Sequence, residues 1–280
     1  MSVELVLAVV EAGEAGSLLD RMPENESCYA GLLKGKILSR LQLGSEFCQR
    51  LLPSPEQVHR IADLTESRGL GFSLVTPLAT DRTIGQLRRL LPLLPSGSEI
   101  IANDWGVLRL LKASFPSLVP VAGRLICKQI KDPRLPSAEW AALYPHGIHS
   151  RGFAAVLQRF GVGRVEMDVP VFAEPENFHS SCMQVSVHAP WGFAVKGRAC
   201  RIGSLNQPDD SKFATDHRCR RECLTYAGRM TRDQGGDGDL TTVQRGNTMF
   251  YRHNPEMAAA VISAVAAGFI DRVIMNGGWP

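Results

Sequence analysis

The sequence lacks the motifs that mark several common classes of enzyme and membrane protein. It has no Gly-x-Ser-x-Gly, no His-Glu-x-x-His and no Cys-His arrangement that would indicate a peptidase. No Gly-x-Gly-x-x-Gly follows its first apolar segment, which argues against dinucleotide binding. No apolar run reaches the length that crosses a membrane, and acidic rather than basic residues flank the short apolar run near the N-terminus. We therefore expect a cytoplasmic protein without a membrane span.

The chain also has little net charge, with 31 Lys and Arg against 28 Asp and Glu, a formal charge of +3. So small an excess does not indicate a nucleic-acid partner by itself. The 280 residues contain 44% hydrophobic residues, enough for a sizeable core, and show no repeat or low-complexity segment. Seven cysteines, an odd number, indicate metal binding or reactive thiols rather than disulfides in a cytoplasmic protein.

Short apolar segments alternate with amphipathic ones along most of the chain, a pattern typical of parallel strands and covering helices. About eight such strands in ~250 residues is the size of a closed barrel. We predict an α/β fold, a TIM-like (β/α) barrel with a complete, incomplete or distorted ring, and keep an open doubly wound sheet as the alternative. Residues 1–280 would form one domain with a cysteine-rich insertion at about 191–226. The predicted strands are 4–10, 36–43, 72–75, 99–102, 116–122, 162–169, 184–188 and 269–275, and the main helices are 55–68, 82–94, 105–115, 152–160 and 254–268.

Three cysteines, Cys200, Cys219 and Cys223, lie within the stretch from Trp191 to Tyr226. Cys219 and Cys223 are four residues apart, a spacing that would place both sulfurs on one face of a helix. Cys200 precedes them across a polar loop that could fold back. Three converging thiols indicate a metal site, which needs a fourth ligand from elsewhere in the chain.

Basic residues accompany these cysteines. Positive neighbours lower the pKa of thiols and favour thiolates, and they offset the negative charge of a cubane cluster with four thiolates. Structural zinc sites usually pair their cysteines as two close doublets, whereas this stretch has one doublet. We therefore favour an iron–sulfur cluster over zinc, with a solvated basic helix face as the simplest interpretation of the charges alone. The basic residues are Arg198, Arg201, Lys212, Arg218, Arg220 and Arg221.

Several runs of residues resemble the U-thirty-two (U32) family of collagenase-like peptidases: LQLGSEFCQR, EIIANDWGVLRLL, LVPVAG, VSVHAPWGFAVKGRAC and CRREC. The likeness extends from about Leu41 to the end of the chain and is greatest to the UbiV-like branch, whose members serve oxygen-independent ubiquinone biosynthesis. It implies an α/β barrel that binds a 4Fe-4S cluster through four cysteines. The positions that match the family's ligands are Cys48, Cys200, Cys219 and Cys223.

The resemblance also implies a function. It indicates an iron–sulfur subunit that acts in oxygen-independent hydroxylation, with a ubiquinone precursor as substrate and a UbiU-like family member as heterodimeric partner. The alternatives are a metal-stabilised scaffold, with zinc or a cluster, and a relative of the family's RNA-modifying members. We do not expect peptidase activity, because no peptidase motif is present. The first 40 residues match the family poorly.

Other residues compete for roles in this site. Cys127 follows a predicted strand and is the best rival as fourth ligand, whereas Cys28 and Cys182 are expected to be ordinary thiols. His188 ends a strand beside the cysteine stretch, where a structural histidine is favoured over a catalytic one because no partner for it is evident. Four more residues lie at predicted strand ends and could line a pocket, although each alone is better explained as a cap or loop residue: Asn103, Asp104, Arg124 and Asp168. We assign no catalytic residue, and we expect the four ligand sulfurs to lie close enough to share a metal.

Overall fold

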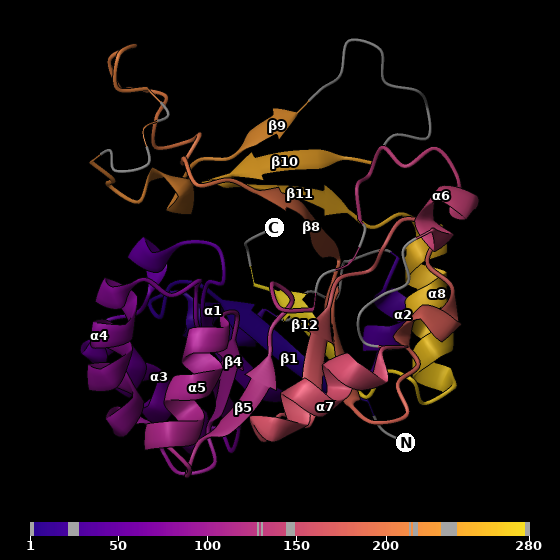
Figure 1. Ribbon diagram of the computed structural model, residues 1–280, viewed down its shortest axis with the longest axis horizontal. Helices are drawn as coiled ribbons and strands as arrows, with labels where there is room; N and C mark the ends of the chain where they lie inside the picture. Colours follow the sequence, from indigo (N-terminus) through magenta and orange to yellow (C-terminus); the bar gives the residue numbers. More distant parts are fainter. Residues whose placement is uncertain are drawn as a thin grey trace.

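Eight parallel strands form a closed barrel, in the ring order β1-β12-β7-β6-β5-β4-β3-β2 (Figure 1). The computed structural model describes residues 3–21, 28–127, 129, 131–143, 149–212, 214, 218–230 and 240–277. The ring closes because β1 pairs with β2 on one side and with β12 on the other. The predicted TIM-like barrel is confirmed, and the sheet is not open. Its strands are β1 Glu4–Val9, β2 Leu38–Gly44, β3 Gly71–Val75, β4 Glu99–Ala102, β5 Val119–Ala122, β6 Arg164–Met167, β7 Gln184–Ala189 and β12 Arg272–Asn276.

Helices surround the barrel, and side-chain caps fix where several of them begin. Ser54 and Gln57 form a capping box at the start of α3, with Pro55 at the first helical position. Asp104 and Asn254 cap α5 and α8, since the side chain of each accepts a backbone N–H of the following helix. The helices are α1 Ala15–Asp20, α2 Ala30–Leu33, α3 Pro55–Ser67, α4 Asp81–Leu90, α5 Trp105–Ser114, α6 Ala138–Ala142, α7 Arg151–Arg159 and α8 Pro255–Ala266. None of them, within the described ranges, combines the length and apolar character that a bilayer-spanning helix needs.

A second, antiparallel sheet lies across one end of the barrel, above the barrel strands in the view of Figure 1. Its strand order is β8-β11-β10-β9, with β8 Trp191–Lys196, β9 Gly228–Met230, β10 Thr242–Arg245 and β11 Thr248–Arg252. This sheet was not predicted: the stretch from Trp191 onward was expected to be a polar loop with a helix. Because β7 leads into β8, the sheet is anchored at the carboxyl ends of the barrel strands.

Ion pairs cross the barrel interior at its amino-terminal end. Arg272 on β12 donates to both carboxylate oxygens of Glu99 on β4, at 2.7 and 2.9 Å. These two strands lie opposite each other in the eight-membered ring, so the pair spans the interior. Arg272 also donates to Glu4 at 2.6 Å, and Arg40 donates to Glu4 at 3.1 Å. The bottom of the barrel is therefore filled by paired charges rather than by apolar side chains.

The arginine partners stabilise the ionised form of Glu4 and Glu99. Burial alone would raise the pKa of Glu99, but the hydrogen bonds and charge of Arg272 outweigh it and leave the pKa below its ordinary value. The pKa of Glu4 is lowered in the same way, by Arg272 and then Arg40 against the effect of burial. Their contribution to folding is therefore complete above the unfolded pKa of about 4.3 and is lost as pH falls through the lowered folded values.

We predict that Arg272→Met lowers the free energy of unfolding at pH 7 by about 3–5 kcal/mol, because it leaves the carboxylates of Glu4 and Glu99 with Arg40 as their remaining ion-pair partner among the described residues. Urea unfolding of the wild type and the variant measures this. Below about pH 4.3 the gap between the two proteins should narrow, since protonated carboxyls no longer need the cation.

The matched control is Arg68→Met, which removes an exposed pair with Asp20 on the protein surface. Its cost should be about 0–1 kcal/mol at pH 7. Equal effects of the two substitutions would mean that the cross-barrel ion pairs do not support the barrel.

Candidate functional site

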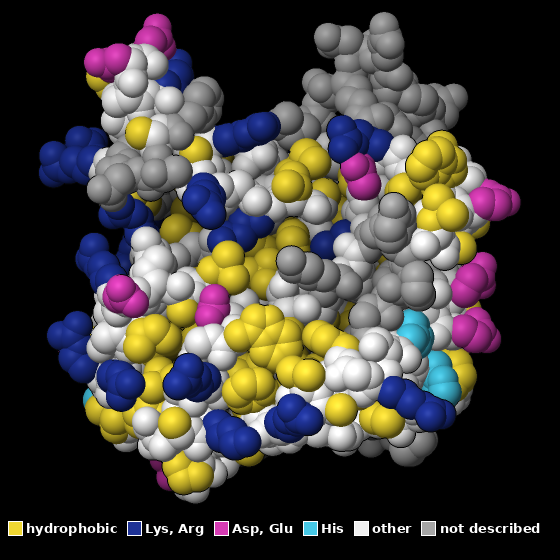
Figure 2. Space-filling model, viewed as in Figure 1, with side chains coloured by type: hydrophobic (Ala, Val, Ile, Leu, Met, Phe, Trp, Pro, Cys, Tyr) yellow, Lys and Arg dark blue, Asp and Glu magenta, His cyan; other side chains and the backbone are white. Residues whose placement is uncertain are grey.

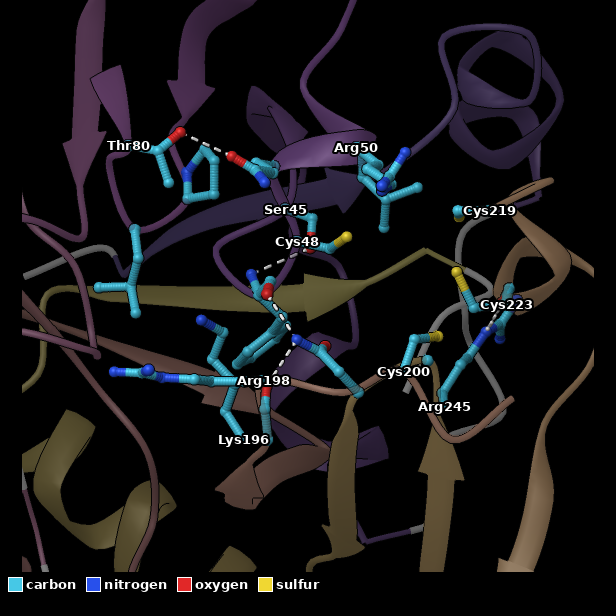
Figure 3. Close-up of a pocket in the computed structure, with 18 residues that line it drawn as sticks. Ser45, Cys48, Arg50, Thr80, Lys196, Arg198, Cys200, Cys219, Cys223 and Arg245 are labelled. Carbon is cyan, nitrogen blue, oxygen red and sulfur yellow. Dashed lines mark hydrogen bonds between the residues drawn. The ribbon is translucent and has the colours of Figure 1, made fainter. Parts of the chain in front are cut away.

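The four cysteines with family-like spacing line one cavity of about 470 Å³ between the barrel and the small sheet. Figure 3 shows Cys48, Cys200, Cys219 and Cys223 around one part of this cavity. They come from three separate segments: Cys48 follows β2, Cys200 follows β8, and the other two precede β9. Cys223 is buried and the other three are half-buried. The structure therefore brings together the set of residues that the sequence singled out.

Glycines allow two of these segments to approach closely. Gly44 ends β2 with φ at 121°, and a Cβ there would lie 2.5 Å from the carbonyl oxygen of Val75. This turn directs the chain toward Cys48. Gly246, at φ 59° in the β10–β11 hairpin, would place a Cβ 3.3 Å from the Cβ of Cys223. The hairpin therefore packs directly against the buried cysteine because its first turn residue has no side chain.

Two side chains of the same hairpin hold the cysteine segments in place. Arg245 donates to the backbone oxygens of Cys223 and Leu224, each at 2.8 Å. Asn247 donates to the backbone oxygens of Phe47 at 2.9 Å and Gly197 at 3.0 Å. The Asn247 amide thus links the residue before Cys48 to the segment that leads into Cys200.

The Cys219–Cys223 pair is not helical, contrary to the prediction. Cys219 lies in an irregular segment, and Cys223 lies in a 3-10 helix of one turn, Glu222–Leu224. Arg221 between them has a left-handed backbone, with φ at 59°, which breaks any helical register. Backbone N–H groups nevertheless point at the sulfurs: Arg221 donates to Cys219 Sγ and Gly203 donates to Cys200 Sγ, both at 3.3 Å. Such donors stabilise anionic sulfur.

Burial and the neighbouring cysteines make the thiols of Cys48, Cys200 and Cys223 hard to ionise. Burial raises the pKa of Cys223, and negative charge on Cys200, Cys48 and Cys219 raises it further, to about 12. Burial likewise raises the pKa values of Cys48 and Cys200, with Cys219 adding to each. Since each thiolate repels the others, this set becomes anionic only with compensating positive charge nearby.

Basic residues supply part of that charge. The cavity is lined by Arg50, Lys196, Arg198 and Arg245, and no carboxylate occurs among its described lining residues. Lys and Arg side chains gather where the barrel meets the small sheet (Figure 2). Of the basic residues singled out in the sequence, only Arg198 lines the cavity. Nothing in the sequence indicated that Arg50, Lys196 and Arg245 would line it.

The sulfurs share a cavity but do not form the tight shell of a single ion. Within the described residues, no three His, Cys, Asp or Glu side chains are arranged to hold one metal ion. The prediction that the four sulfurs lie close enough to share a metal stays a prediction. Four thiolates around zinc would sit roughly 3.8 Å apart, from Zn–S bonds of about 2.3 Å in a tetrahedron.

The remaining cysteines lie away from this cavity. Cys127, the rival fourth ligand, is buried beneath the barrel mouth, where its Sγ donates to the backbone oxygen of Ala122 at 3.7 Å. Burial, then the nearby Glu166, raises the pKa of Cys127. Cys182 is exposed and Cys28 is half-buried, and neither lines the cavity.

A buried charge network occupies the carboxyl mouth of the barrel. Arg124 donates to Glu46 at 2.6 Å and to Asp168 at 2.7 Å, and Lys131 forms a very short contact with Asp168. Burial raises the pKa of Asp168, but Lys131 and Arg124 outweigh it and bring the pKa to about 2. Burial lowers the pKa of Lys131 to about 8 despite Asp168. Arg124 and Asp168 were candidate pocket residues; Glu46 and Lys131 were missed, because nothing in their local sequence marks them.

Of the other candidate residues, Asn103 and Asp104 have structural roles, and His188 contacts a buried carboxylate. Asn103 donates to the backbone oxygen of Thr76 at 3.0 Å and accepts the N–H of Leu125 at 3.1 Å, so it joins loops. Asp104 only caps α5. His188 has a partner that the sequence did not reveal, since its Nε2 lies 3.0 Å from Glu166 Oε2.

No protein-family model and no curated protein matches the chain. Among solved structures it is similar to the U32 peptidase Mk0906, with 11% identity over 98% of this chain and 92% of that one, at a TM-score of 0.45. It is also similar to the carboxyl transferase domain of Rhizobium etli pyruvate carboxylase, with 11% identity over 98% of this chain and 39% of that one, at a TM-score of 0.41. A third similar structure is a Paenibacillus barengoltzii N-acetylglucosaminidase of glycoside hydrolase family 18. It is 9% identical over 98% of this chain and 94% of that one, at a TM-score of 0.40. At these scores, the function of this chain has to be argued from its own residues.

We predict that Asn247→Ala weakens metal binding about 10- to 100-fold while all four cysteines remain, because supporting hydrogen bonds of this kind hold ligands in position. Metal content after competition with a chelator measures the loss, and circular dichroism checks that the variant is folded. Asn206→Ala, at an exposed position in the same part of the chain, is the control and should bind metal like the wild type. Equal metal retention in both variants would show that the Asn247 link does not position the site.

Proposed function

We propose that this chain is an iron–sulfur protein whose Cys48, Cys200, Cys219 and Cys223 hold a 4Fe-4S cluster, and that it acts with a second family member in oxygen-independent hydroxylation. The observation that supports the proposal is the convergence of four cysteines from three segments on one basic cavity. This set coincides with the positions that the resemblance to the U32 family implies. The proposed substrate, a ubiquinone precursor, and the proposed UbiU-like partner come from that resemblance alone.

The size of the cavity is compatible with a cluster. A cubane places iron and sulfide between its four thiolates, which therefore lie farther apart than the ligands of one zinc ion. The cavity of about 470 Å³ leaves such space, and the described cysteines do not form a single-ion shell. A structural zinc site would instead draw the four sulfurs together in a closed tetrahedron.

The charge around the cavity fits an anionic centre. Four thiolates give the cluster a net negative charge, and Lys196, Arg198 and Arg245 line the cavity without a carboxylate among its described residues. The N–H groups of Gly203 and Arg221 already point at two of the sulfurs. When bound, the cluster would supply one-electron chemistry; the chain's own part is to hold, shield and charge-balance it.

We predict that protein purified without oxygen contains about four irons and matching sulfide, with the broad visible absorption of thiolate-to-iron charge transfer. Cys48→Ala and Cys223→Ala should each lose most of the iron and colour. Iron, sulfide and zinc analysis with the visible spectrum measures this. Cys127→Ala, a buried cysteine outside the cavity, and Cys182→Ala, an exposed one, are matched controls and should retain the cluster.

The alternatives give different results in the same preparation. One zinc without colour would contradict the cluster and favour a metal-stabilised scaffold. Loss of iron in Cys127→Ala but not in Cys48→Ala would contradict the ligand set. Nucleic acid bound to the purified protein would favour the RNA-modifying relatives, and the basic cavity would then contact phosphates.

The partner is tested separately, by co-expression with a UbiU-like protein and gel filtration without oxygen. Co-elution as a one-to-one complex is the expected result. Separate elution of two cluster-loaded proteins would contradict the partnership but leave the cluster in place.

A further inference from the structure

A second, much smaller cavity lies at the carboxyl mouth of the barrel, beside the cysteine cavity. Its volume is about 20 Å³, which is enough for one water-sized group, such as a water molecule or the hydroxyl end of a small molecule. Gln42, His188 and Asn276 line it, from β2, β7 and β12. Ser45 and Phe47 line both cavities, so the two are neighbours.

The three side chains carry unsatisfied polar atoms. Six buried side-chain atoms in the described part of the chain lack a hydrogen-bond partner, and Gln42 Oε1, His188 Nδ1 and Asn276 Oδ1 are three of them. Gln42 is 1% exposed and His188 is 4% exposed. Because an unpaired buried polar atom is costly, three such atoms around one cavity indicate a missing partner at that place.

Glu166 determines the hydrogen-bonding roles of the unsatisfied atoms of Gln42 and His188. Its Oε1 accepts from Gln42 Nε2 at 2.6 Å, which leaves Gln42 Oε1 as an acceptor. Its Oε2 lies 3.0 Å from His188 Nε2. An ionised carboxylate only accepts, so it favours the proton on Nε2 and leaves a lone pair on Nδ1. With the amide oxygen of Asn276, the side chains that line the cavity carry three acceptors without a hydrogen-bond partner in the described structure, so the cavity suits a hydrogen-bond donor.

The charge at the cavity favours a neutral donor. Arg124 and Glu46 also line it, but they are ion-paired with each other at 2.5 Å. Arg124 is also paired with Asp168. The charged groups that line the cavity thus satisfy one another and leave no unpaired charge to select a cation or an anion.

We propose that this cavity binds a single hydroxyl group, donated to His188 Nδ1 and to the amide oxygens of Gln42 and Asn276. The group comes from a water molecule or from the alcohol end of a small molecule whose remainder extends toward the cysteine cavity. Glu166 is a positioning residue, since it fixes the histidine tautomer and the amide orientation without lining the cavity. This site does not depend on the proposed cluster, because it contains no cysteine.

Nuclear magnetic resonance of protein with nitrogen-15-labelled histidine tests the site, with methanol as the probe. His188 should show a protonated Nε2 and an unprotonated Nδ1, and methanol should shift the Nδ1 signal in a saturable way. His253 is an internal control: its Nδ1 lies 2.7 Å from the Tyr29 hydroxyl, it does not line the cavity, and its signal should not move. Acetate, which only accepts hydrogen bonds at neutral pH, should have no effect. Asn276→Leu should weaken the response to methanol roughly 2- to 10-fold, the usual loss for one hydrogen bond.

A crystal structure of the free protein and one soaked in methanol distinguish the two sources. A single oxygen peak within hydrogen-bond distance of Nδ1 that survives methanol identifies water, and its replacement by methanol identifies an alcohol site. Either result supports hydroxyl binding. A protonated Nδ1, a response to acetate equal to that for methanol, or no density beside Nδ1 would overturn it.

Discussion

The pairing of β1 with both β2 and β12 is the interaction on which the rest of the structure depends. It closes a sheet of parallel strands, and closure places the carboxyl end of every strand on the same face. Cys48 leaves β2 on that face, and β8 leaves β7 on it. Residues 150 positions apart in sequence can therefore line one cavity.

The two ends of the barrel use buried charge differently. At the amino end, Arg272 and Glu99 span the interior and are fully paired, as expected for a structural network. At the carboxyl end, Glu166 bridges Gln42 and His188 but leaves one polar atom of each unsatisfied. A buried polar group without a partner in the protein usually receives its hydrogen bond from a ligand or a water molecule. This contrast separates a barrel end that stabilises the fold from one that has capacity to bind.

The cysteine cavity presents a related contrast between its thiols and its basic lining. Buried thiols near one another resist ionisation, as the raised pKa of Cys223 shows, yet metal binding needs thiolates. The cavity surrounds them with arginine and lysine side chains and directs backbone N–H groups at two sulfurs. These features lower the cost of an anionic centre, and they support our assignment of an iron–sulfur cluster over four independent thiols.

The barrel could be predicted from sequence because its signal is local. Most barrel strands are short, largely apolar runs next to a helix, and all eight predicted strands overlap observed ones. The strands β9, β10 and β11 were missed because they are short and pair with one another and with β8 rather than with the barrel, and β10 is also polar. The helices α1 and α2 are short and were not predicted.

The site was predictable only in part. The cysteine set followed from family-like runs of residues, whereas the helical spacing argument for Cys219 and Cys223 was wrong, because Arg221 adopts a left-handed conformation. Glu166 lies between the core residues Val165 and Met167 on β6. Its partners His188 and Gln42 could not be foreseen, because they lie 22 and 124 residues away in sequence and meet only in the closed ring.

The most direct test of the central claim is anomalous diffraction at the iron edge from crystals grown without oxygen. The account predicts one iron-rich peak in the cavity, bonded to the sulfurs of Cys48, Cys200, Cys219 and Cys223. Iron located elsewhere, or a single zinc ion on three or four of these sulfurs, would contradict it.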